Sequence, residues 1–496
     1  SSGGETQTAS ESAESGKITK TDIVVGQASD IVTLDPAGQQ DTTSGVLMKH
    51  AYSTLLDVDN EGKVVPDLAE SYEMKSDTEY VFKLREDACF WDGTPVTAQD
   101  VKFSLDRAKG MPKTKSNTSK IEEVTVNGDH EVTIKLTEPY AAFKTIVTQH
   151  NLSILSEKAV TEAGDSYGDV DNLLGSGPFK VTEWVPNDHY TLVRNDNYWG
   201  EMPIATSITC RVIPEGSART IALEAGEIDV VWSVDPTDCA NVESNPDVKL
   251  LSQPSTGIDY VGMNTQKEKF SDKRVRQAIN YALDKQAFVD TIIEGRGLVA
   301  NSYINAAIPG WTDEVEAYPY DPEKAKELLA EAGYPDGFEC SIFVNGDLRT
   351  RSAQILQAQL ADVGIKVDIS TYEWGALLDT LNAGEHEMFL LGWSNTSFDP
   401  DGSTYQLFYS GNHGATGNRA FFSNDKVDEL ILSAQRESEE SKRMELYKEL
   451  QFVLHEESPW CPLYYKENNV GVRADLKGFT LHAGAQHYLG NCHYEE

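Results

Sequence analysis

The chain has 496 residues, of which 39% are hydrophobic and 25% are charged, as in an ordinary globular protein. This length exceeds one ordinary core and predicts about two to four domains. Its 80 acidic and 42 basic residues give a formal net charge of −38. That field repels nucleic acid and anionic lipid headgroups, so we expect neither as a partner.

The opening stretch, SSGGETQTASESAESGK, contains no leucine and no aromatic residue. Such a composition cannot bury enough apolar surface to offset the entropy of ordering, so residues 1–17 are predicted to form a flexible tether. No charged-then-apolar signal segment precedes it, and a Ser/Gly-rich start is what remains when one is removed. No apolar stretch approaches the roughly 18 residues that span a bilayer.

The first half reads as a mixture of strands and helices. Strand patterns cover residues 23–34, 79–86 and 131–138. Helix-like apolar spacing runs through residues 46–74, with a turn at residues 60–62. A further helix is predicted to begin at Thr97, because Asp100 completes a capping-box pattern.

The second half is more helical. One helix is predicted over residues 272–293, ended by Gly295 and Gly297. A second begins with Asp321 as N-cap and Pro322 at its first position, and ends before Gly333. Residues 350–370 are predicted to form a helix and then a strand, with Gly364 between them. Two further helices are predicted near 425–437 and 440–455.

Six segments, taken in order, resemble the landmarks of one family. They are VVPDLAESYE, ACFWDGTPVTAQDVKFSLDRA, GSGPFKVTEW, FSDKRVRQAINYALDKQAFV, YDPEKAKELLAEAGYPDG and GWSNTSFDPDG. The family is that of the family 5 extracytoplasmic solute-binding proteins, the peptide-, nickel- and glutathione-type receptors of ABC importers. The likeness runs from about residue 19 to the C-terminus, and six ordered segments make a far stronger signal than any one of them.

The resemblance implies an α/β, bilobed periplasmic-binding-protein-like fold of the class II type, with an extra inserted α+β domain. The expected division is a tether at 1–17, a discontinuous domain I at 18–50, 175–262 and 472–496, an inserted domain II at 51–174, and domain III at 263–471. It also implies two lobes that close on a ligand, with no catalysis, no cofactor and no metal.

The implied function is capture of a peptide or peptide-like small solute outside the membrane and its delivery to the permease subunits of an ABC importer. A non-peptide ligand, such as a metal chelate or a glutathione-like compound, is the alternative. The tether suits a spacer from a lipid-modified cysteine, as in Gram-positive receptors, although that cysteine is not in the sequence. In a Gram-negative cell the location would be periplasmic. We expect a monomer, since no heptad or long apolar surface run is present.

The stretch EMFLLGWSNTSFDPDG, residues 387–402, carries the main site candidates. The apolar run turns abruptly polar after Trp393, and the resemblance places this loop at the cleft, so we expect Trp393 in a pocket rather than in a core. Asn395 is either an adaptable ligand contact or a solvated loop residue. Thr396 stands where peptide-binding members carry an Asp that pairs with the peptide's α-amino group.

A hydroxyl cannot supply the charge-assisted bond of a carboxylate. Either another acid serves, or the ligand lacks a free amino terminus, in which case free peptides are poor ligands. Asp399 is the nearest alternative acid and looks equivalent to one in glutathione- and dipeptide-type members. On turn chemistry alone, however, an Asp that fixes the turn before Pro400 is favoured.

Three further candidates come from the resemblance. Gln39 and Gln40 follow Asp35-Pro36 in a segment that lines the pocket of nickel-type relatives; an exposed polar turn is at least as good an interpretation. Arg349, with Arg351, lies near the position where dipeptide receptors hold the ligand carboxylate, although Arg351 could equally be a solvated residue at the start of a helix.

The residues also allow other functions. A secreted hydrolase could use Asp399 and Asp401, but residues two apart on an extended segment point to opposite faces. An adhesin that kept the fold is a second alternative. The residues His482, His487, Cys492 and His493 lack the spacing of a zinc site, and we expect them in a C-terminal surface segment. The six cysteines contain no C-x-x-C pair, and their disulfide state is left open.

Overall fold

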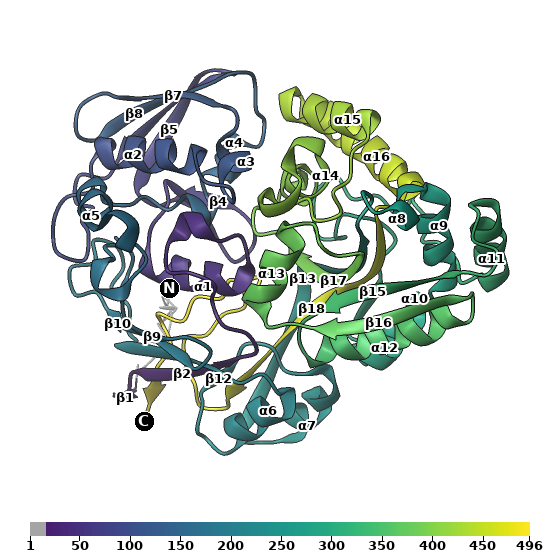
Figure 1. Ribbon diagram of the computed structural model, residues 1–496. Helices are drawn as coiled ribbons and strands as arrows, with labels where there is room; N and C mark the ends of the chain where they lie inside the picture. The colour runs from purple at the N-terminus through teal and green to yellow at the C-terminus, as the bar shows by residue number, and fades with distance from the viewer. Residues whose placement is uncertain (1–15) are drawn as a thin grey trace, which may run out of the picture.

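The computed structural model describes residues 16–496, so the predicted tether lies almost wholly outside the described residues. Its main feature is an 11-stranded mixed sheet in the order β16-β15-β17-β13-β18-β12-β2-β11-β10-β9, with β14 paired to β18 (Figure 1). The strands are β2 (Asp22–Gln27), β9 (Phe179–Val185), β10 (His189–Arg194), β11 (Ser207–Val212), β12 (Val230–Val231), β13 (Val248–Met263), β14 (Gly297–Val299), β15 (Phe338–Val344), β16 (Ile365–Thr371), β17 (Met388–Ser394) and β18 (Trp460–Arg473).

Strands β13 and β18 join the two halves of this sheet. They are antiparallel partners of 16 and 14 residues, and their register shifts between Pro254 and Ile258. Proline has no N–H to donate to the ladder, so an interruption at this point is expected. On one side of the shift the pair lies beside β12, and on the other side β13 pairs with β17. The two lobes visible in Figure 1 are thus connected by two adjacent strands.

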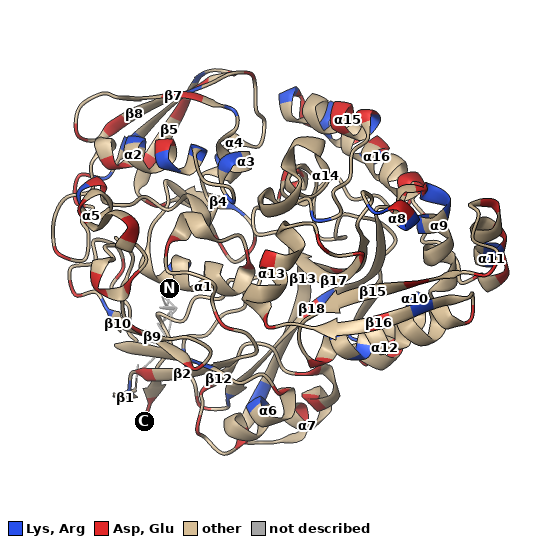
Figure 2. Cartoon of the chain, viewed as in Figure 1, with Lys and Arg blue, Asp and Glu red and all other residues tan. Residues whose placement is uncertain are grey.

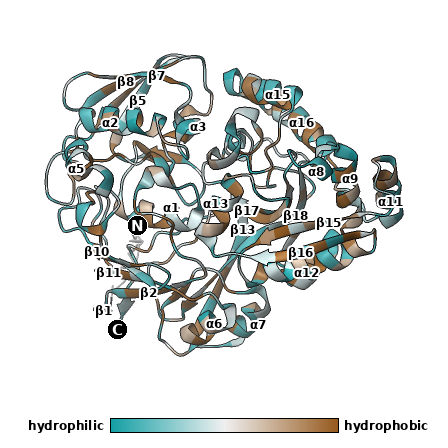
Figure 3. Cartoon of the chain, in the orientation of Figure 1, coloured by the Kyte–Doolittle hydropathy of each residue, from teal (hydrophilic) through white to brown (hydrophobic). Residues whose placement is uncertain are grey.

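In the lobe of β13–β17, helices cover both faces of the sheet. Successive residues of one strand enter opposite cores: Val261 packs with one helical layer and Tyr260 with the other. The first layer is α9 (Lys273–Ala282), α10 (Lys285–Ile292), α11 (Pro322–Glu331) and α12 (Asp347–Ala361), and the second is α13 (Trp374–Asn382), α14 (Tyr405–Phe408), α15 (Asp425–Arg436) and α16 (Glu440–Glu457). Figure 3 shows the hydrophobic strands between these layers.

The other half of the sheet packs against α1 (Thr42–Ala51) and the C-terminal residues Leu489 and Cys492. A small separate core forms beneath α6 (Gly216–Glu224) and α7 (Cys239–Ser244).

Another core lies between α2 (Ala98–Lys109) and a four-stranded sheet of order β5-β6-β8-β7. Its strands are β5 (Ala69–Ser76), β6 (Glu79–Leu84), β7 (Ile121–Val126) and β8 (Glu131–Leu136), joined by the hairpin of β3 (Leu56–Val58) and β4 (Val64–Pro66). The remaining elements are β1 (Ile18–Lys20), β19 (Tyr494–Glu495), α3 (Lys115–Thr118), α4 (Phe143–Ile146), α5 (Glu157–Ala163), α8 (Glu268–Ser271) and the 3-10 turns η1 (Pro36–Gly38), η2 (His150–Leu152), η3 (Gly164–Ser166), η4 (Val170–Asn172), η5 (Pro236–Asp238), η6 (Pro400–Ser403), η7 (Ser410–Asn412) and η8 (Gly414–Thr416).

Several predicted helix ends are confirmed. The Asp321 side chain accepts from Lys324 N, Pro322 begins α11, and Gly333 follows with a φ of +96°. Thr97 and Asp100 form the capping box of α2. These ends are local chemistry, which explains why the sequence alone places them.

Two predicted helices differ in the structure. The helix-like stretch from residue 46 is helical only to Ala51, because the residues that follow pair as the β3–β4 hairpin around the predicted turn at 60–62. The single helix predicted over 272–293 is two helices. Leu283 is extended, and Asp284 caps α10 by accepting from Ala287 N; Gly297 begins β14 rather than ending a helix.

The expected C-terminal surface segment is instead buried. His482 and His487 are each 1% exposed and Cys492 is fully buried. Burial lowers the pKa of His482 to about 2 and that of His487 to about 3, so both rings are neutral at ordinary pH. All six cysteines are free, and no metal-binding group of three or more side chains occurs among residues 16–496.

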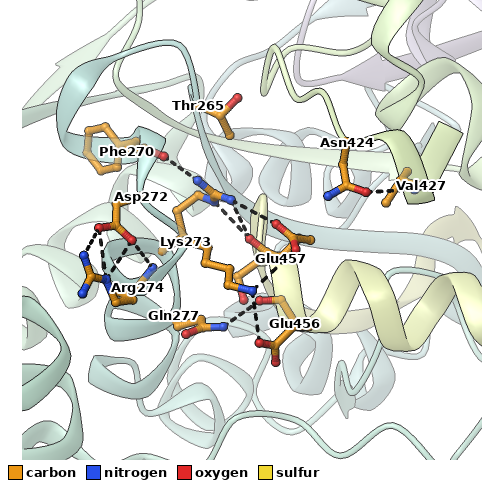
Figure 4. Close-up of polar contacts among 12 residues, drawn as sticks. Thr265, Phe270, Asp272, Lys273, Arg274, Gln277, Asn424, Val427, Glu456 and Glu457 are labelled. Carbon is orange, nitrogen blue, oxygen red and sulfur yellow. Dashed lines mark hydrogen bonds and ion pairs between the residues drawn. The ribbon is translucent and has the colours of Figure 1, made fainter. Parts of the chain in front are cut away.

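The C-terminal end of α16 is tied to the start of α9 (Figure 4). The guanidinium of Arg276 donates to the Glu457 carbonyl oxygen at 2.8 Å and to the Phe270 carbonyl oxygen at 2.7 Å. Lys273 pairs with Glu456 at 3.4 Å. These bonds satisfy carbonyl groups that the helix end leaves free.

Charged residues are spread over the helices and loops of both lobes (Figure 2). Within the described part of the chain, none of the helices combines the length and apolar character needed to cross a bilayer.

Candidate functional site

Two cavities lie where the lobes meet. The smaller one, called here the inner pocket, has a volume of about 60 Å³ and is lined by residues 39–42, by parts of 116–151, by parts of 393–406 and by Gln486. The larger one, called here the outer cavity, has a volume of about 1000 Å³ and is lined mainly by residues from 28–32, 212–236, 345–349, 371–379 and 464–469. The outer cavity is at the upper end of the size range for small-molecule sites.

A thin wall of side chains separates the two cavities. Gln40 lines the inner pocket and donates to the carbonyl oxygens of Lys113 and Thr416, both at 2.8 Å. Asp41 also lines the inner pocket, and it accepts a 3.2 Å hydrogen bond from Trp374 Nε1. Lys113 and Trp374 line the outer cavity, so the two cavities adjoin at these residues.

Trp393, at the end of β17, contributes to both pocket and core. Its ring lines the inner pocket, and it packs, half-buried, against the hydrophobic core of its lobe. Its Nε1 donates to the Gly402 carbonyl oxygen at 2.8 Å. The expectation of a pocket position is therefore met, with a structural role added to it.

Asn395 organises the loop from within. It is 1% exposed, so a solvated loop asparagine is the wrong interpretation. Its Oδ1 accepts from the backbone N–H groups of Ser397 and Phe398, and its Nδ2 donates to Asp399 O and Ser403 Oγ. Asn395 also lines the inner pocket, beside Thr396.

Asp399 faces away from both cavities. Its carboxylate caps the turn η6 by accepting from Asp401 N at 2.9 Å, and it forms an ion pair with Arg443, whose side chain is 4% exposed. It is not among the residues that line either cavity. The turn interpretation of Asp399 is thus the one that fits its surroundings.

Asp401 lines the inner pocket but is already bound. It accepts from the Tyr140 hydroxyl and from Gln435 Nε2, and it is 2% exposed. Burial, with the neighbouring Asp399, raises the pKa of Asp401 to about 6. Because Asp399 and Asp401 each have their own protein partners, they do not form the paired carboxylates of a hydrolase.

Gln39 and Gln40 are inside the molecule. Gln39 is 3% exposed, and both residues line the inner pocket. The interpretation as an exposed polar turn is wrong, because Gln39 is buried and Gln40 is half-buried. Their part in binding stays a prediction.

Arg349 lines the outer cavity, apart from the other candidates. Its guanidinium and the Lys466 ammonium share the carboxylate of Asp259, at distances of 3.2 and 3.1 Å. Burial favours the neutral acid, but these two cations hold the pKa of Asp259 well below its usual value. Arg351, on the same helix, pairs with Asp235 at 2.9 Å.

Several residues that line the inner pocket carry no local sequence signal. Ser116, Asn117, Tyr140, Gln149 and Asn151 are far in sequence from the Trp393 loop, and nothing in their local pattern marks them as pocket residues. Asp41 had a signal: it precedes Thr42-Thr43-Ser44 as a helix N-cap.

Comparisons agree with this architecture. Residues 63–415 match the family model described as bacterial extracellular solute-binding proteins, family 5. The glutathione-binding protein GsiB of Escherichia coli O157:H7 is 32% identical over 479 residues, which cover 93% of this chain and 92% of the relative.

Two solved structures share the fold. The periplasmic binding protein DppA of Helicobacter pylori, in complex with the peptide STSA, is 28% identical with a TM-score of 0.90, over 96% of this chain and 98% of that one. The oligopeptide-binding protein AppA of Bacillus subtilis, in complex with a nonapeptide, is 26% identical with a TM-score of 0.90, over 97% and 100%. The chain belongs to the bacterial extracellular solute-binding proteins of family 5.

Proposed function

We propose that this chain is the receptor of an ABC importer and captures a peptide or peptide-like solute between its lobes. The observation that carries this proposal is the pair of adjoining cavities at the lobe junction, lined by polar side chains from separate cores. The named ligands of the relatives, a peptide and glutathione, support this ligand class. A non-peptide chelate is the second candidate.

The outer cavity supports a ligand that carries a carboxylate. Two cations, Arg349 and Lys466, share the single carboxylate of Asp259 there. A guanidinium can add a charge-assisted hydrogen bond to a second carboxylate. We propose that Arg349 binds the acidic end of the ligand.

We further propose the domain division expected from the resemblance: domain I at 18–50, 175–262 and 472–496, domain II at 51–174 and domain III at 263–471. The separate hydrophobic cores support it, since one core draws on residues 55–154 and two others on residues 258–465. Strands β13 and β18, with their shift at Pro254–Ile258, would serve as the hinge.

The proposal places the protein outside the cytoplasm, as a monomer that binds the permease subunits and performs no catalysis. A lipid anchor ahead of the tether would hold it at the cell surface. Membership of the family supports the location outside the cytoplasm and the permease partner.

Mass spectrometry of compounds that co-purify with the protein tests the ligand class directly. Small-angle scattering, before and after their removal, then tests closure: we expect a smaller radius of gyration when ligand is bound. A protein that retains no compound, and binds neither a tripeptide mixture nor glutathione by calorimetry, would contradict the proposal.

A further inference from the structure

The inner pocket gathers polar atoms that have no partner. Within residues 16–496, the lining side chains with a buried, unpaired atom are Gln40 (Oε1), Asp41 (Oδ1), Ser116 (Oγ), His150 (Nδ1) and Asn151 (Oδ1). Three of these atoms are oxygens that can only accept. A buried polar atom without a hydrogen bond is costly, so several of them around one cavity indicate a ligand rich in donors.

The charges of the inner pocket also favour a ligand group that donates hydrogen bonds. Its lining includes two carboxylates, Asp41 and Asp401, but no lysine or arginine from the described part of the chain. A group that donates several hydrogen bonds and carries positive charge satisfies both observations. A primary ammonium has three donors and no acceptor, which fits this set of oxygens.

Of the two acids that line the inner pocket, only Asp41 has a carboxylate oxygen without a partner. The Asp399 carboxylate binds Arg443, and the two oxygens of Asp401 accept from Tyr140 and Gln435. Asp41 uses Oδ2 to accept from Ser44 and Trp374, while Oδ1 has no partner.

Two cations lie in the neighbourhood of Asp41. Burial lowers the pKa of Lys113 and that of Arg419, and the charge of Asp41 partly opposes this effect in both. Neither cation comes within 4.0 Å of the Asp41 carboxylate, which forms no ion pair with any residue that the structure describes. Its charge is therefore not neutralised by direct contact.

We infer that Asp41 is the counter-charge for a primary ammonium group of the ligand, in place of the carboxylate that is absent at position 396. Gln40, Asn151 and the Thr396 hydroxyl supply neutral acceptors around it. This inference rests on the proposed function, since it names the group recognised at the same site. A volume of about 60 Å³ suits an ammonium and its α-carbon, so the rest of the ligand would extend past Gln40 toward the outer cavity.

Asp41→Asn tests the inference with little structural change. Asparagine is as good an N-cap as aspartate and keeps an oxygen for Ser44 and Trp374, so α1 should remain intact. Asp321→Asn makes the same replacement at the N-cap of α11, remote from both cavities, and is the matched control. Asp41→Ser, which also caps, provides a second variant should the first fold poorly.

Two probes are used: a tripeptide mixture with every residue type at the central position, and glutathione. Each probe is measured in two forms, one with a free amine and one N-acetylated. For the wild type and Asp321→Asn, calorimetry should show that each free-amine probe binds roughly tenfold to a hundredfold more tightly than its N-acetylated form. In Asp41→Asn and Asp41→Ser this preference should vanish, with unchanged affinity for the acetylated probes. Thr396→Asp, added to Asp41→Asn, should restore it by returning a carboxylate to the same pocket.

Equal wild-type affinity for free and acetylated probes would overturn the inference and leave the proposed function standing. So would an amine preference that survives both substitutions at position 41, or a folded double variant without rescue. Failure of the wild type to bind any probe would overturn the proposed function, and the inference with it.

Discussion

The Thr396 hydroxyl donates a 2.7 Å hydrogen bond to Gln149 Oε1, and so joins the Trp393 loop to a segment of a different core. Both residues line the inner pocket. The position that resembles the amine-binding site of peptide receptors is therefore occupied by a residue that holds two parts of the protein together around the pocket.

Thr396→Val should weaken ligand binding by about 1 kcal/mol, because it removes this bond and leaves Gln149 Oε1 without its donor. Calorimetry with the compound that co-purifies is the measurement. Thr380→Val, which removes an exposed hydroxyl bonded only within α13, should change nothing. Equal effects of the two substitutions would show that the Thr396 bond does not support binding.

Trp393→Ala should lower ligand affinity by more than 1 kcal/mol, as is usual for a large aromatic residue in a pocket. It should also lower the free energy of unfolding, since the ring packs against the core and binds Gly402 O. Trp393→Phe keeps most of the packing and should fold better. If the Ala variant lost stability while its folded fraction bound normally, Trp393 would be a core residue alone.

Arg443→Met should cost about 3–5 kcal/mol of folding free energy, because it leaves the Asp399 carboxylate in a poorly hydrated site without its partner. Lys426→Met breaks exposed pairs with Glu429 and Glu449 and should cost less than about 1 kcal/mol. Urea denaturation of both variants provides the comparison. A small loss for Arg443→Met would mean that the Asp399 ion pair adds little to folding.

Asp401 should make stability depend on pH. Its pKa is raised from 3.8 to about 6 in the folded protein. Below about pH 4 the acid is neutral in both states; as pH rises toward 6 and above, ionisation is easier in the unfolded chain, and the native state loses about 3 kcal/mol relative to it. Asp401→Asn removes the ionisable group. In urea denaturation, the free energy of unfolding of this variant, relative to that of the wild type, should therefore rise between pH 4 and pH 7. A constant difference would contradict the raised pKa.

Local chemistry explains what could be read from the sequence. The cap at Asp321, the capping box at Thr97 and the turn at residues 60–62 depend on neighbours within a few residues, and all are present. The family, and with it the bilobed fold, followed from the order of six segments. The helix predicted over 272–293 is two helices, because Leu283 is extended and Asp284 caps a new helix within a stretch of continuous apolar spacing.

The site was harder to predict because it is assembled from distant segments. Trp393, Asn395, Thr396, Gln39 and Gln40 all reach the inner pocket, whereas Arg349 reaches the outer cavity. The inner pocket's other wall, including Asn151, comes from a separate core and has no local signature. Asp399 fits the turn interpretation that its sequence favours, but its partner Arg443 lies on a helix that the sequence does not connect to the loop.

The first and last strands of the described chain, β1 and β19, are partners, with Ile18 opposite Glu495. The ends of the described chain therefore lie side by side, and Figure 1 shows β1 beside the C-terminus. A short peptide could join residue 496 to residue 16, and new ends could be opened at the tip of the β7–β8 hairpin, where Gly128 has open space around it. Such a circular permutant should keep both cavities, and would place a fluorophore fused to its new termini on the four-stranded sheet of β5–β8.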